Sequence, residues 1–168
     1  MKYAKKAVSC FCKGFSEYPF NWKHIYFGPS NAGSANLLYP EKSGMKASMT
    51  CYPYDDIETW RGVPAKYHVS EQERLYSVET LKTQYMKLYT EWEKGLELIK
   101  DMPICEFKDM AEYCYTLFKA SFNQVSYYIE RNDKNDYQKL REIVKDEMNL
   151  AVNAYKIMLR NCAVGYEA

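Results

Sequence analysis

Apolar residues recur every three or four positions along most of the chain after residue 70. Charged and polar residues fill the positions between them, so each run has one apolar and one polar side. This period is typical of amphipathic helices that bury one side against a core. The pattern predicts three long helices, near residues 70–100, 105–131 and 135–163.

Capping signals give the expected ends of these helices. Ser70 and Glu73 stand at the spacing of a capping box, which predicts the start of the first long helix. Pro103 follows its expected end, since proline disfavours helix at the residue before it. Asn135 is the expected N-cap of the third helix.

The same periodicity predicts which side chains face the core. In the second long helix they are Phe107, Met110, Cys114, Leu117, Phe118, Val125 and Tyr128. In the third they are Leu140, Ile143, Val144, Met148, Ala151, Tyr155, Met158 and Cys162.

The first third of the chain has a different pattern. Residues 2–16 predict a short amphipathic helix with lysines on its outer side. Residues 22–62 hold three aromatic or β-branched runs, typical of short strands, between stretches of glycine, proline and asparagine. We therefore expect one mainly α domain over residues 1–168, with a small β and loop insert at about 22–62. Its helices should form an up-down antiparallel bundle of three long helices plus the short N-terminal one.

Charge and hydropathy restrict the function classes. The chain has 23 basic and 22 acidic residues and a net charge of +1, which argues against a nucleic-acid interface. No apolar run approaches the ~20 residues that span a bilayer, and the first residues are too polar for a signal peptide. These features predict a soluble protein that binds no membrane and is either cytoplasmic or has lost a targeting segment.

The six cysteines show no metal-binding or disulfide spacing. Only two histidines, His24 and His68, are available to complete a zinc site. We expect reduced, structural cysteines, no metal and no cofactor. The six are Cys10, Cys12, Cys51, Cys105, Cys114 and Cys162.

The insert is the one place where aromatic and polar groups converge in sequence. Asp55 and Asp56 are adjacent carboxylates that either act as acid, base or hydroxyl acceptor, or cap a turn and face solvent. Asn31 and Asn36 either present amides to a ligand or serve as turn residues.

The insert's aromatic side chains have two interpretations as well. They form a stacking surface for a sugar, or they hold an irregular segment on the helices. The candidate ligand-binding set is Trp22, Asn31, Asn36, Tyr54, Asp55, Asp56, Trp60 and Arg61.

Four polar residues interrupt the apolar run of the second long helix. We expect some of them to face inward and to hydrogen-bond the irregular insert, a structural role, because buried backbone in a long loop needs such partners. They are Ser121, Asn123, Gln124 and Ser126.

Four stretches carry a resemblance to a known group of proteins: "FSEYPF", "YFGPSNAGSANLLY", "MTCYPYDDIETWRG" and "EWEKGLELI". In this order they resemble a segment of large uncharacterised bacterial proteins of glycoside-hydrolase type, over residues 15–62 and on to about 99. The resemblance implies a helical region that follows a catalytic barrel, in a carbohydrate context. The chain itself is too short for a (β/α)8 barrel, which takes ~250 residues.

Three hypotheses for function follow. The first is an accessory or C-terminal helical domain of a carbohydrate-active protein, with a carbohydrate ligand or a neighbouring catalytic domain as its partner and no catalysis of its own. The alternative is a stand-alone helical scaffold that binds another protein through a tyrosine-rich surface. The third is a small enzyme that uses Asp55 or Asp56.

Overall fold

The computed structural model describes residues 2–20, 38, 76–134 and 136–164, and these residues are mainly helical. This confirms the mainly α class. The described elements are α1 (Lys2–Phe15), α4 (Val78–Leu98), α5 (Glu106–Ile129), a π-helical turn η5 (Glu130–Lys134) and α6 (Tyr137–Arg160).

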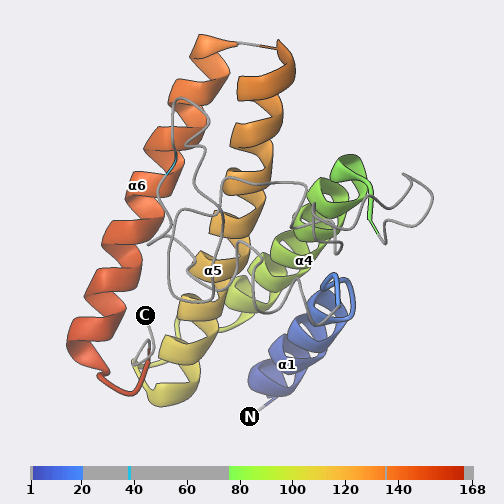
Figure 1. Ribbon diagram of the computed structural model, residues 1–168. Helices are drawn as coiled ribbons and strands as arrows, with labels where there is room; N and C mark the ends of the chain where they lie inside the picture. The colour runs from blue at the N-terminus through green and yellow to red at the C-terminus, as the bar shows by residue number, and fades with distance from the viewer. Residues whose placement is uncertain (1, 21–37, 39–75, 135, 165–168) are drawn as a thin grey trace.

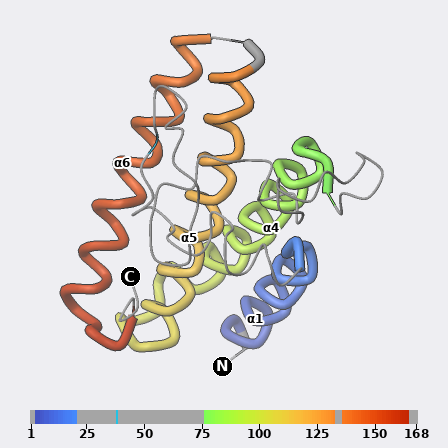
Figure 2. The backbone as a smooth tube through the Cα atoms, viewed as in Figure 1, coloured from blue at the N-terminus to red at the C-terminus, as the bar shows by residue number. Residues whose placement is uncertain are grey.

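The helices pack in chain order. α1 packs against α4, α4 against α5, and α5 against α6. α5 and α6 lie side by side and run in opposite directions, and α1 lies beside α4 away from α6 (Figures 1 and 2). Each long helix therefore has its main partner next to it in the sequence.

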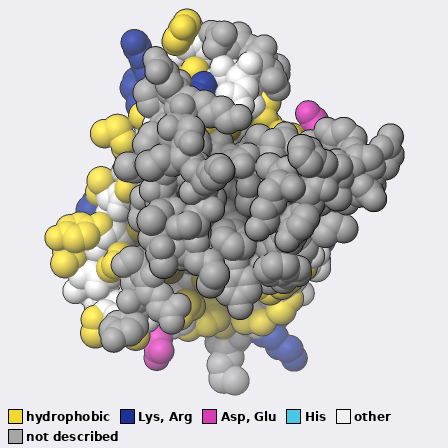
Figure 3. Space-filling view, in the orientation of Figure 1, with side chains coloured by type: hydrophobic (Ala, Val, Ile, Leu, Met, Phe, Trp, Pro, Cys, Tyr) yellow, Lys and Arg dark blue, Asp and Glu magenta, His cyan; other side chains and the backbone are white. Residues whose placement is uncertain are grey.

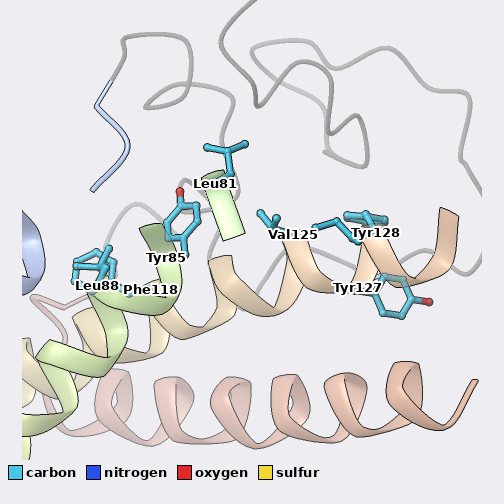
Figure 4. Packing of buried hydrophobic residues seen from close by; sticks show 8 residues of the cluster. Leu81, Tyr85, Leu88, Phe118, Val125, Tyr127 and Tyr128 are labelled. Atoms are coloured by element: carbon cyan, nitrogen blue, oxygen red, sulfur yellow. The ribbon is translucent and has the colours of Figure 1, made fainter. Parts of the chain in front are cut away.

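The larger core cluster joins α4 to the C-terminal half of α5. Tyr85 and Leu88 of α4 are fully buried, as are Val125 and Tyr128 of α5. In Figure 4, Val125 and Tyr128 lie on one side of α5, whereas Tyr127 projects from the other side toward α6. α5 is thus enclosed on both sides, which explains why almost every residue from 120 to 131 is buried.

A second cluster joins α1 to α4 and to the start of α5. Phe11 stacks on Trp92 with ring centroids 4.5 Å apart, and Trp92 meets Phe118 edge-on at 4.9 Å. The indole Nε1 of Trp92 donates a hydrogen bond to the backbone oxygen of Ala111, 2.8 Å away. Trp92 therefore links three helices, and the one polar atom of its half-buried indole is hydrogen-bonded.

Two helix starts differ from the sequence prediction. α4 begins at Val78 and not near residue 70, because the Ser77 hydroxyl accepts a hydrogen bond from the Thr80 backbone N–H at 3.0 Å. The cap of α6 is Asp136 and not Asn135: its carboxylate accepts from the backbone N–H groups of Gln138 and Lys139. Capping signals are local and recur in sequence, so they do not by themselves select the serine or acid that is used.

The predicted core faces of α5 and α6 are wrong in part. Phe107 and Met110 are 39% and 44% exposed, because the first turns of α5 bury Asp109 and Ala111 instead. Asp109 is drawn inward by the guanidinium of Arg160 on α6, whose Nε lies 2.7 Å from its carboxylate. On α6, the predicted core residues Met148 and Tyr155 face outward as well.

The predicted β insert at 22–62 lies outside the described residues except for Leu38. That side chain is half-buried and packs against the larger core cluster. The strands expected in the insert and its aromatic surface stay predictions.

Candidate functional site

All of the ligand-binding residues predicted in the insert lie outside the described residues. The structure therefore does not test their convergence on one surface. They are Trp22, Asn31, Asn36, Tyr54, Asp55, Asp56, Trp60 and Arg61.

The four polar residues of α5, some of which were expected to face inward, are all buried. Their expected hydrogen bonds to the insert stay a prediction, because the insert lies outside the described residues. Ser121 Oγ donates to the Leu117 backbone oxygen at 2.8 Å, a local bond within the helix. Asn123 reaches across to α6, where its amide nitrogen lies 2.9 Å from Asp146 and 3.0 Å from Glu147. The polar interruption of the apolar run thus marks a polar contact between α5 and α6.

Glu147 is a carboxyl group that the sequence analysis did not single out. It is 6% exposed and lies on the side of α6 that faces α5. Burial raises its pKa to about 7, the Asn123 hydrogen bond lowers it, and the nearby Asp146 charge raises it. The sequence could have indicated that Glu147 is buried, since position 147 lies on the same side of the helix as Leu140, Val144 and Leu150.

Glu130 forms a second buried polar contact, at the π-helical turn. It is 1% exposed and pairs with Lys139 of α6, while the Lys82 ammonium on α4 lies 3.9 Å away. The Arg131 guanidinium lies 4.5 Å from the centre of the Tyr128 ring. The buried Glu130 carboxylate and the two nearby lysines therefore have a structural role: they connect α4, the π-helical turn after α5, and α6.

Arg160 forms a charged contact at the other end of α5 and α6. Its side chain pairs with Asp109 and also with Glu112. A pocket of about 190 Å³ opens beside this contact, lined by side chains of α4, α5 and α6. Tyr115 in its wall donates to Glu93 at 3.1 Å, and burial followed by that carboxylate raises its phenol pKa, so it stays neutral. Tyr115 is therefore not an activated nucleophile in this pocket.

The described part of the chain holds no group of three or more histidine, cysteine, aspartate or glutamate side chains that could bind a metal ion. The described cysteines are Cys10, Cys12, Cys105, Cys114 and Cys162, and each is a free thiol. Among the described helices, none is both long and apolar enough to cross a bilayer.

α6 carries a second apolar side, which faces away from α5. Met148, Val152, Tyr155 and Leu159 are 64%, 51%, 61% and 69% exposed. They follow one another at helical spacing and so form one stripe, which we call the outer face of α6. In Figure 3 hydrophobic side chains gather along the left edge of the molecule, where α6 lies in Figure 1.

Met148 and Tyr155, which the apolar period predicts to be core residues, belong to this exposed surface instead. The apolar residues of α6 in fact form two separate stripes, which are rotated relative to each other around the helix axis. Residues 140, 143, 144, 150, 154 and 157 form the stripe toward α5, and 148, 152, 155 and 159 form the other.

Cations border the outer face of α6. Arg141 and Lys145 lie seven and three positions before Met148, and Lys156 lies four positions after Val152, all exposed. None of the three forms an ion pair with any described carboxylate. Several other exposed lysines do: Lys13 and Lys94 pair with Glu91, Lys87 with Glu17, and Lys100 with Glu97. The outer face is therefore both apolar and positively charged.

Comparison with known proteins gives no relative: no family model, no curated protein and no solved structure matches the chain.

Proposed function

We propose that this protein is a helical protein-interaction module whose docking surface is the outer face of α6. The observation that carries the proposal is the exposed stripe of Met148, Val152, Tyr155 and Leu159. Single exposed apolar residues are normal on proteins, whereas four consecutive ones at helical spacing mark an interaction site. Methionine and tyrosine are also enriched in protein interfaces.

The charges beside the stripe select the kind of partner. Arg141, Lys145 and Lys156 lack described carboxylates, while Asp146 and Glu147 of the same helix turn toward α5. The partner that fits is an amphipathic helix with acidic residues flanking an apolar stripe. A second copy of the chain fits less well, because it would bring the same cations against each other.

The test is fluorescence anisotropy with two labelled peptides that form amphipathic helices. They share one apolar stripe and differ only in flanks of glutamate or of lysine. The glutamate peptide should bind and the lysine peptide should not. Val152→Gln should weaken binding at least tenfold by removing apolar contact, and Lys145→Glu should weaken it by charge reversal. Met86→Gln, at an exposed position of α4, is the matched control and should leave binding unchanged.

Three results would overturn the proposal. The first is equal binding of both peptides. The second is self-association of the chain in sedimentation that Val152→Gln abolishes. The third is binding to phosphatidylserine vesicles without binding to either peptide, since a basic apolar helix face also suits an anionic membrane.

The carbohydrate hypothesis is a separate proposal, supported by the resemblance over residues 15–62. It concerns an accessory helical domain without catalysis of its own, in which the full chain is an up-down bundle and the insert carries the ligand. Titration with oligosaccharides, followed by tryptophan fluorescence, tests it. Trp60→Ala should abolish the signal, and a response that survives this change would count against the insert as the site. A cytoplasmic location is a further expectation of either proposal.

A further inference from the structure

One amide group at the interface between α5 and α6 contacts two carboxyl groups of very different exposure. The Asn123 amide nitrogen lies 2.9 Å from Asp146 and 3.0 Å from Glu147. The Asp146 side chain is 45% exposed, whereas Glu147 is almost completely buried. Two neighbouring acids of α6 therefore meet the same partner in different surroundings.

Asp146 has a cation beside it and Glu147 has none among the described residues. The Lys119 ammonium of α5 lies 3.8 Å from Asp146. Glu147 receives hydrogen bonds from Asn123 and Gln124, both uncharged, and its Oε1 atom has no hydrogen-bond partner. Two phenols of α5 lie near this contact among the described residues, Tyr115 and Tyr127, and Tyr127 projects toward α6 (Figure 4). Burial raises the pKa of both phenols, the Asp146 charge helps to raise the pKa of Tyr115, and both are neutral.

An ionised Glu147 would be a buried charge with no compensating cation in the described part of the chain, which is among the most unfavourable arrangements in a protein interior. Protonation removes that charge and leaves both amide hydrogen bonds able to form on the other oxygen. We propose that Glu147 is a proton-sensitive switch in the interface between α5 and α6. The protonated side chain stabilises the packing of α6 on α5, and the ionised side chain destabilises it. This switch is independent of what binds the outer face of α6.

The direction of the effect follows from proton linkage. The pKa of Glu147 is about 7 in the folded chain, above the ordinary value of 4.5, so the folded chain holds an extra proton between these values. Stability must therefore fall as pH rises from about 4.5 to about 7, and the loss is complete above that range. Acidification in this window tightens the α5–α6 contact.

The test compares urea unfolding of the full chain and of Glu147→Gln at several pH values from 5 to 9. Glutamine keeps the size of the side chain and cannot ionise. Between about pH 5 and 7, the unfolding constant of the natural chain should rise by up to tenfold per pH unit relative to Glu147→Gln. Hydrogen exchange, corrected for intrinsic rates, should show that the added opening concentrates in α5 and α6 and spares α1.

Asp146→Asn is the matched control, because it alters the other carboxyl on the same amide. It should keep the pH dependence, with a slightly lower midpoint since a like charge is removed. Should Glu147→Gln fail to fold, ¹³C NMR of the Glu147 carboxyl in the natural chain provides the answer. A midpoint near 4.5, or the same pH dependence in Glu147→Gln, would overturn the proposal.

Discussion

The Phe11 ring of α1 occupies the space in which any residue larger than glycine at Gly95 would place its Cβ. A Cβ built at Gly95 would lie 2.3 Å from Cε1 of Phe11 and 2.6 Å from Cδ1. This contact lets α1 approach α4 closely enough for Phe11 to stack on Trp92. Glycine in mid-helix usually costs about 1 kcal/mol relative to alanine, so its place here has a packing reason.

Gly95→Ala should therefore destabilise the protein despite the better helix propensity of alanine. The expected loss is about 1–2 kcal/mol in the free energy of unfolding, from overpacking against Phe11. Chemical denaturation measures it. In a Phe11→Ala background the clash is gone, and the same change should be neutral or stabilising. A loss of equal size in both backgrounds would show that the ring is not the cause.

Asp109→Ala should destabilise the protein more than Glu112→Ala does, although both remove a partner of Arg160. Asp109 is buried and accepts from Arg160 at 2.7 Å and from Asn161 at 3.4 Å. Glu112 is about one-third exposed. We expect a loss of about 2 kcal/mol for Asp109→Ala and under about 1 kcal/mol for Glu112→Ala. Equal losses in thermal unfolding would contradict the asymmetry.

Asp136→Ala should fray the start of α6. The carboxylate accepts from the backbone N–H groups of Gln138 and Lys139, each at 3.1 Å. Losing such a cap costs about 1 kcal/mol. Asp136→Asn should restore most of it, because asparagine caps as well as aspartate does. Hydrogen exchange in the first turn of α6 is the measurement, and unchanged protection in Asp136→Ala would be inconsistent with this cap.

Cys114 should react slowly with iodoacetamide in the folded chain at pH 8. Burial raises the pKa of its thiol to about 11, and only the thiolate is nucleophilic. At that pH about one thiol in a thousand is ionised, given a tenfold change per pH unit. Cys12 and Cys162 are exposed and should react first. Mass spectrometry of labelled peptides gives each rate, and modification of Cys114 as fast as Cys162 would contradict the burial.

The long helices were predictable because their apolar period persists over many turns. The core side of α4, with Leu81, Tyr85 and Leu88 buried, follows the apolar period of three to four residues. The starts were less predictable, because Ser70 and Ser77 both precede helical sequence and a local capping signal does not select between them. The Asp109 side chain is buried because it pairs with Arg160, 51 residues later in the sequence. No local sequence pattern predicts such a distant partner.

The candidate surface was harder to predict than the fold. The many apolar positions of α6 predict one broad face that is buried in the core. A helix that packs mainly against one neighbour buries only some of these positions. Tyr155 and Met148 were therefore assigned inward. Glu147 was passed over because a glutamate on a helix is usually solvated, and only the position of Asn123 across the interface makes it a buried partner.

The order of packing along the chain has a kinetic consequence. α4, α5 and α6 are joined by the short segments 99–105 and 130–136, whereas residues 16–77 separate α1 from α4. Contacts between sequence neighbours form early, and closing a long loop costs more entropy. α1 should therefore dock after the transition state for folding. Substitution of Phe11 should then accelerate unfolding while leaving the refolding rate nearly unchanged, so that α1 determines how long the native state persists and not how fast it is reached.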